Sequence, residues 1–163
     1  MSMMQDDNQP PIGAESPHIH RLSIDTDLKN CKLDVLKELY GRSILRMELE
    51  PSGLGRFRHE LAVSTVSDIS IGFHSTTSMG YARTQELIDD DCDDTALLIL
   101  QKGRAMFQQR GHDVTLEPGN GVLIRNGEAG TLNIPDSAQY VSICLPSSDF
   151  ILPRRNADNV YLN

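Results

Sequence analysis

Tryptophan is absent from this 163-residue chain, and the other aromatic residues are few, with four Phe and four Tyr. The three cysteines, Cys31, Cys92 and Cys144, are odd in number, lie far apart and form no CxxC pair. This spacing argues against a disulfide framework and against a zinc clip. A reducing, cytoplasmic location is therefore expected.

A long apolar run and a basic surplus are also lacking. The longest apolar run, ALLIL at 96–100, is too short for the hydrophobic part of a signal peptide or for a membrane span. Lys and Arg number 15 against 23 Asp and Glu, which gives a formal charge of −8. Binding of nucleic acid through its phosphates needs a basic stripe. The charge therefore argues against direct DNA binding by this chain and gives no reason to expect a membrane partner.

The first part of the chain divides into two by composition. Residues 1–24 are rich in Pro, Ser, Gly and Asp at their start and are predicted to be a disordered leader. Residues 25–41 then carry apolar side chains at helical spacing, namely Leu28, Cys31, Val35, Leu36 and Leu39. We therefore predict a helix over about 27–40, which ends at Gly41.

From residue 42 onward the apolar period falls to two. Glycines at 103, 111, 119 and 127 follow one another at intervals of eight residues. Between these and other turn residues, strands are predicted over 95–102, 104–110, 112–118, 120–126, 128–134 and 139–145, with a turn at 135–136. Many short strands at near-constant spacing indicate an antiparallel sandwich or barrel. We expect one all-β domain over 42–150.

Several ordered motifs in this region resemble those of a known family. GRAMFQQRGHDVTLEPG at 103–119 is similar to the core of a cupin barrel, and more specifically to the N-terminal effector-binding domain of AraC-type transcriptional regulators. The stretch 81–103 resembles the family's arginine, acidic turn and apolar strand. EPGNGVLI at 117–124 resembles its Pro-Gly corner, and YVSICLP at 140–146 its closing strand. The resemblance covers about residues 40–150.

The resemblance implies a fold and a function. The fold would be a cupin-like antiparallel β-barrel or jelly roll, preceded by the helix. The function would be ligand sensing and dimerisation in a transcription factor, with a small-molecule effector as partner and a homodimer as the assembly. DNA would be contacted only through a helix-turn-helix domain outside this chain, and residues 151–163 would begin the segment that leads to dimerisation helices. No enzymatic activity, cofactor or metal is implied.

A small cupin metalloenzyme, an isomerase or dioxygenase, is the alternative. Metal-binding cupins carry a His-x-His after their first glycine, and RAMFQQRG at 104–111 has no histidine. His59 and His74 lie on separate predicted strands, and with a carboxylate these two imidazoles would make up a metal site.

The interior of a small barrel is just wide enough for side chains or one small ligand. Six residues are predicted to line it and to contact the effector: Phe73, Arg83, Leu97, Ile99, Phe107 and Ile124. The strand 95–102 is apolar on both faces, so Leu98 and Leu100 are equally good candidates for its inward side. Arg83 precedes the acidic stretch 89–94, and it would pair either with these aspartates or with an anionic group on the effector.

Overall fold

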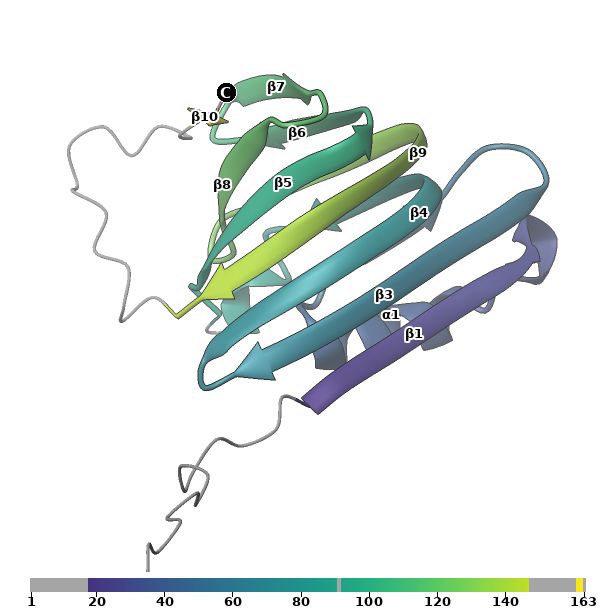
Figure 1. Cartoon of the computed structure of the whole chain (residues 1–163), viewed down its shortest axis with the longest axis horizontal. Helices are drawn as coiled ribbons and strands as arrows, with labels where there is room; N and C mark the ends of the chain where they lie inside the picture. The colour runs from purple at the N-terminus through teal and green to yellow at the C-terminus, as the bar shows by residue number, and fades with distance from the viewer. Residues whose placement is uncertain (1–17, 91, 147–160, 163) are drawn as a thin grey trace, which may run out of the picture.

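The computed structural model describes residues 18–90, 92–146 and 161–162, and Figure 1 shows how their strands are arranged. A large antiparallel sheet, here called the front sheet, faces the viewer, and the helix α1 lies behind it. Its strand order is β1 (His18–Asp27), β3 (Arg56–Val66), β4 (Ile69–Arg83), β9 (Gly130–Leu145), β5 (Thr95–Gly103), β8 (Gly121–Arg125) and β10 (Tyr161–Leu162). The predicted antiparallel, mainly β architecture is confirmed.

A smaller back sheet shares two strands with the front sheet. β2 (Glu48–Pro51) pairs with the second half of β4, β6 (Ala105–Gln109) pairs with the first half of β9, and β7 (His112–Leu116) pairs with β6. β4 and β9 therefore run through both sheets and join them into a two-layered jelly roll. The short 3-10 turns Leu28–Asn30 and Ile88–Asp90 lie in the connections.

β4 and β9 pass from one sheet to the other where their pairing shifts register. Thr77 pairs with Ser137, but two residues further along β4 the partner is Ile134, so β9 carries one extra residue here. Pro135 lies in this bulge, where a residue without a backbone N–H is tolerated. The turn predicted at 135–136 is therefore wrong: the bulge lets one continuous strand bend where two strands were expected.

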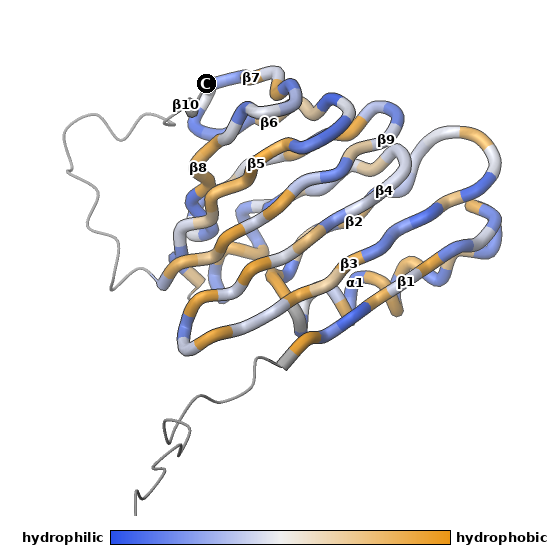
Figure 2. Tube along the Cα trace, viewed as in Figure 1, coloured by the Kyte–Doolittle hydropathy of each residue, from blue (hydrophilic) through white to orange (hydrophobic). Residues whose placement is uncertain are grey.

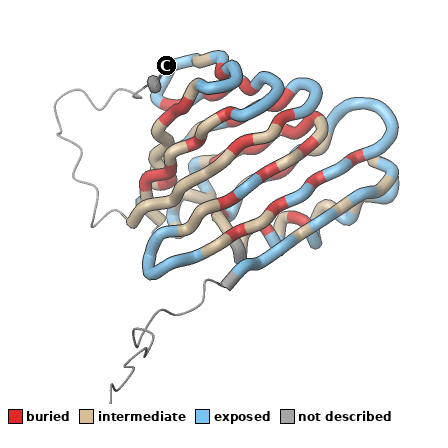
Figure 3. The backbone as a smooth tube through the Cα atoms, in the orientation of Figure 1, coloured by how far each residue is buried: buried red, intermediate tan, exposed pale blue. Residues whose placement is uncertain are grey.

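The hydrophobic core lies between the two sheets. Alternate residues of β3 and β6 are buried, as expected for strands with one face toward a core. Figure 3 shows this alternation along the front strands as red bands, and β1 at the edge as mostly exposed. Phe57 from β3 is 1% exposed, and the other large core residues include Met79, Leu98, Leu100, Phe107, Leu116 and Ile134.

The helix α1 (Leu33–Ser43) covers the part of the front sheet that the back sheet does not reach. Leu36 and Tyr40, one turn apart, are its buried residues. Val35 and Leu39, which the spacing also assigned to the buried face, are 47% and 36% exposed. The helix begins at Leu33, six residues later than the predicted start at 27.

The segment before the helix differs from its prediction. Residues 18–24 were assigned to a disordered leader, yet they form most of β1, which pairs along its whole length with β3. The physical reason is a short alternation in which Leu22 and Ile24 pack against the core. Asp25 adds ion pairs to Arg56 and Arg58 on β3. The rest of the predicted leader and most of 151–163 lie outside the described residues.

The outer face of the front sheet is also apolar. Ile71 pairs with Ile143, which pairs in turn with Leu97 on β5. Figure 2 shows hydrophobic residues gathered along β4, β9 and β5 at this end of the sheet. In the part of the chain that the structure describes, no helix has the length and apolar character that crossing a membrane requires.

The buried and exposed phenylalanines predict very different losses of stability. Phe57→Ala should lower the free energy of unfolding by about 3–5 kcal/mol, because it leaves a cavity in a packed core. Phe73→Ala should lower the free energy of unfolding by less than about 1 kcal/mol, because Phe73 is 54% exposed. Urea unfolding of the two variants measures both values, and equal losses would contradict the assigned orientation of β4.

Two turn glycines allow a second comparison of variants that should differ in stability. Gly103 and Gly111 have φ angles of 85° and 76°, which favour glycine. A Cβ on Gly103 would lie 2.0 Å from the Ser137 carbonyl oxygen, whereas one on Gly111 would meet nothing within 4 Å. Gly111→Ala should therefore cost about 1 kcal/mol of stability, and Gly103→Ala clearly more. Thermal unfolding ranks the two, and a reversed order would refute this account.

Candidate ligand-binding cavity

A cavity of about 70 Å³ lies between the two sheets. One water needs roughly 10–15 Å³ of such space, so the cavity has room for about five waters or for a small organic molecule. Both sheets contribute to its wall, and Ile44 and Met47 join it from the end of α1 and the segment that follows. The cavity therefore touches every layer of the domain.

Four aromatic rings form one end of the cavity. Tyr40 comes from α1, His74 and Tyr81 come from β4, and Tyr140 comes from β9. The His74 ring stacks on Tyr140 with 4.3 Å between ring centres, and Tyr40 lies 5.8 Å from Tyr81. The Nε2 of His74 lies 2.9 Å from the Ser142 hydroxyl, and its Nδ1 lies 3.5 Å from the Tyr40 hydroxyl. One ring nitrogen thus has a close partner, and the other has a distant one.

Some buried polar atoms at this end lack a hydrogen-bond partner. The Tyr81 hydroxyl is one of them: it is buried and forms no hydrogen bond of normal geometry, although the hydroxyls of Tyr140 and Thr76 lie near enough to lower its pKa. Thr76 Oγ1 and both ring nitrogens of His59, on the neighbouring inner face of β3 and β4, are the others. A buried hydroxyl left unpaired costs about 1–3 kcal/mol, so these atoms favour the entry of a water or a ligand group.

Burial keeps both interior histidines neutral. It lowers the pKa of His59 to about 4, and together with the nearby His59 it lowers the pKa of His74 to about 3. Burial also raises the pKa of Tyr81 to about 12. The aromatic end of the cavity therefore carries no net charge at neutral pH, and its groups act as hydrogen-bond donors and acceptors.

The cavity wall around Arg83 is polar and already paired. The Arg83 guanidinium forms a two-pronged ion pair with Asp90 and also donates to the carbonyls of Asn126 and Arg46 at 3.0 and 2.8 Å. The structural alternative for Arg83, pairing with the acidic stretch, is thus observed. Arg83 holds the pKa of Asp90 below its usual value, so this pair contributes stability above the ordinary carboxyl pKa and loses it as the pH falls through the lowered value.

Gln109 fixes the neighbouring wall. Its side-chain nitrogen donates to the carbonyls of Arg125 and Glu128 at 2.9 and 3.2 Å, and its oxygen accepts from the Arg125 amide at 3.1 Å. The residue is 2% exposed and lies on the inner face of β6. These bonds hold β6 against the turn that follows β8 and close this side of the cavity.

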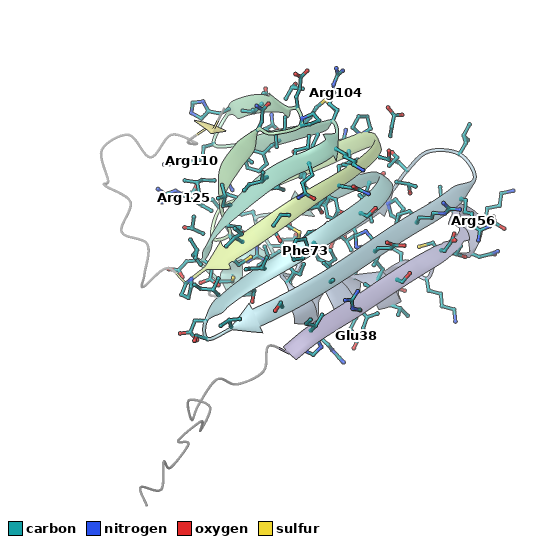
Figure 4. The ribbon with its side chains drawn as sticks, in the orientation of Figure 1. Glu38, Arg56, Phe73, Arg104, Arg110 and Arg125 are labelled. Carbon is teal, nitrogen blue, oxygen red and sulfur yellow. The ribbon has the colours of Figure 1, made fainter. Side chains whose placement is uncertain are left out.

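The predicted lining residues divide by the face on which they lie. Arg83, Phe107 and Ile124 line the cavity. Phe73, Leu97 and Ile99 lie on the outer face of the front sheet, and Figure 4 shows Phe73 at the middle of that face. The inward positions of β5 are Leu98 and Leu100, which the sequence left as the equal alternative. The orientation was misassigned because the outer face is as apolar as the core.

The sequence reasoning missed the aromatic end. On β4 the inward residues are Gly72, His74 and Thr76, so the polar side chains point in and the apolar ones point out. Tyr81 and Arg83 could have indicated this part of the cavity. They are two residues apart on one strand, so their side chains lie on the same face of β4. Tyr40 gave no strand signal, because it reaches the cavity from the helix.

The two histidines of the metalloenzyme alternative do lie inside the domain. His59 and His74 are both buried, and each lies about 6 Å from the Tyr40 ring between ring centres. Among the described residues, no group of three or more His, Cys, Asp or Glu side chains is arranged to hold a metal ion.

Two antiparallel sheets joined by shared strands around a cavity define a cupin-like jelly roll. The chain belongs to the family of AraC-binding-like domains, which matches residues 36–158. The resemblance seen in the sequence is thereby confirmed.

Solved structures extend the comparison. The AraC-like transcriptional activator CuxR is similar in fold, with a TM-score of 0.63 and 17% sequence identity over 79% of this chain and 48% of CuxR. This chain therefore spans about half of that structure. The EutQ protein of Clostridium difficile (TM-score 0.45, 13% identity, 56% of this chain and 70% of that one) and a cupin superfamily protein of Desulfitobacterium hafniense (0.45, 13%, 55% and 78%) are more distant. None of the curated proteins compared with the chain matches it.

The Arg83–Asp90 pair predicts a specific loss of stability. Asp90→Asn should lower the free energy of unfolding by about 2 kcal/mol at pH 7, because the buried guanidinium loses its charged partner. Asp89→Asn is the matched control, since Asp89 is an exposed neighbour, and it should change stability by less than about 0.5 kcal/mol. Equal effects in urea unfolding would contradict the structural role of this pair.

The buried histidines predict acid sensitivity. Each has a folded-state pKa below its ordinary value of 6.5, so the unfolded chain binds protons first and stability falls as the pH drops from about 6.5 to 4. Each histidine should contribute about 1.4 kcal/mol per pH unit in this window. His59→Leu should reduce the slope of unfolding free energy against pH by about half in this window, and an unchanged slope would contradict the prediction.

Proposed function

We propose that this chain is the effector-sensing part of an AraC-type transcriptional regulator and that the effector is a small molecule bound in the cavity between the sheets. The observation that carries the proposal is a cavity with an unpaired buried hydroxyl inside a domain of this family. The chain binds no DNA itself. Its acidic charge fits a division of labour in which a separate helix-turn-helix domain makes the phosphate contacts.

The cavity wall suggests how occupancy is transmitted. Tyr40, Ile44 and Met47 contribute one side, and β4, β5 and β9 contribute the other. A ligand that contacts both sides stabilises the packing of α1 on the sheets. It shifts the equilibrium only by its difference in affinity between the packed and the loosened arrangement. In the regulator, a homodimer in the cytoplasm, this difference would set the spacing of the DNA-binding domains.

Thermal unfolding with a panel of metabolites tests the proposal. A ligand present at one hundred times its dissociation constant should add about 2.7 kcal/mol to the stability of the chain. Ala96→Leu places a larger side chain in the cavity wall and should abolish the shift. Ala82→Leu is the matched control, because Ala82 lies on the opposite face of β4 and does not line the cavity, and it should keep the full response.

The outcomes separate cleanly. A ligand shift that survives in Ala96→Leu would place the binding site elsewhere and overturn the proposal. Stoichiometric iron, manganese, nickel or zinc in the purified protein would instead support the metalloenzyme alternative.

A further inference from the structure

The charges around the cavity limit what it accepts. Three charged residues contribute to its wall: Arg83, Arg125 and Glu128. The guanidinium of Arg83 is paired with Asp90 and with two backbone carbonyls, and Glu128 lies 3.2 Å from Arg110. Arg125 is only partly buried, so its charge stays within reach of water. A charged ligand group would therefore enter a site whose nearest buried charges are already neutralised, at a large desolvation cost.

Part of the cavity wall is hydrocarbon. Leu98 projects from the front sheet, and Phe107 and Leu132 project from the back sheet, all three less than a tenth exposed. None of these side chains offers a hydrogen bond, so the part of a ligand that lies against them gains affinity only by burying apolar surface.

The aromatic end carries the hydroxyl groups that can hydrogen-bond to a ligand. The Tyr81 hydroxyl forms no hydrogen bond of normal length and angle, although the hydroxyls of Tyr140 and Thr76 lie near enough to lower its pKa. His74 Nε2, in contrast, lies close to the Ser142 hydroxyl. The Tyr40 hydroxyl lies 3.5 Å from His74 Nδ1, a separation at the outer limit for a hydrogen bond. A hydroxyl donates and accepts, so Tyr81 pairs equally well with a ligand hydroxyl or with a ligand carbonyl.

We infer that the effector is a small uncharged molecule, mostly hydrocarbon, with a single hydroxyl or carbonyl group that hydrogen-bonds to Tyr81. This inference rests on the proposed function, since it names the class of ligand for the same cavity. It replaces the expectation of an anionic group beside Arg83, because the donors of that side chain are committed to Asp90 and to the backbone. Binding gives the Tyr81 hydroxyl a hydrogen-bond partner and leaves the ion pair between Arg83 and Asp90 intact.

Calorimetric titration with three probes of similar size tests the inference. Phenol carries one hydroxyl, toluene carries none, and benzoate carries a negative charge at pH 7. Phenol should bind the wild-type chain more tightly than toluene by about fivefold to tenfold, the amount that one hydrogen bond supplies. Benzoate should bind at least tenfold more weakly than phenol.

Tyr81→Phe isolates the hydrogen bond. The variant removes a buried hydroxyl that forms no hydrogen bond of normal geometry, so it should fold with nearly unchanged stability. Its affinity for phenol should fall by about fivefold to tenfold, to that for toluene, while the toluene affinity stays unchanged. Ala96→Leu should weaken both probes together, which would place them in the cavity.

The failures of the two proposals are distinguishable. An unchanged phenol affinity in Tyr81→Phe, or benzoate binding as tight as phenol, would overturn the ligand class while sensing in the cavity stands. If none of the three probes binds but a charged metabolite of the panel stabilises the chain through the cavity, the ligand class is again wrong. If neither the probes nor the panel binds, both the ligand class and the proposed function are overturned.

Discussion

The long antiparallel pairing of β4 with β9 is the contact on which the domain depends. Both strands begin in one sheet and end in the other, and their shared bulge at Pro135 turns them from layer to layer at the same point. Because the two sheets are joined by continuous strands, their separation is fixed by backbone hydrogen bonds as well as by side-chain packing. An internal space can therefore persist without the sheets collapsing onto each other, and α1 needs only to cover the remaining gap (Figure 1).

The regular part of the fold was accessible from the sequence because its turns are encoded locally. A glycine with positive φ at 103, 111 or 119 marks a turn whatever the rest of the chain does. Pro135 misled for the opposite reason: a proline marks a turn in isolation, but here pairing with β4 converts it into a bulge. β1 escaped prediction because only Leu22 and Ile24 carry its alternation, and the β3 edge that they pack against is more than thirty residues away.

The site was harder to predict than the fold, because its residues break the rule that apolar side chains point inward. On β4, Phe73 faces out and His74 faces in, an arrangement that makes sense only once the outer face of the sheet is also apolar. The same rule predicts the correct orientation on β6 and β8, where Phe107 and Ile124 line the cavity. Tyr40 shows a further limit: a helix residue and strand residues meet in one site only through tertiary packing, and no local period records it.

The tyrosines give the domain a built-in optical probe. The chain has no tryptophan, and three of its four tyrosines, Tyr40, Tyr81 and Tyr140, surround the cavity, while the fourth belongs to β10. Ultraviolet emission of the chain therefore originates mainly from rings whose spacing depends on how α1 sits against the two sheets. A change in the packing of α1 alters energy transfer among these rings, so the intrinsic tyrosine fluorescence changes with the packing around the cavity and no attached dye is needed.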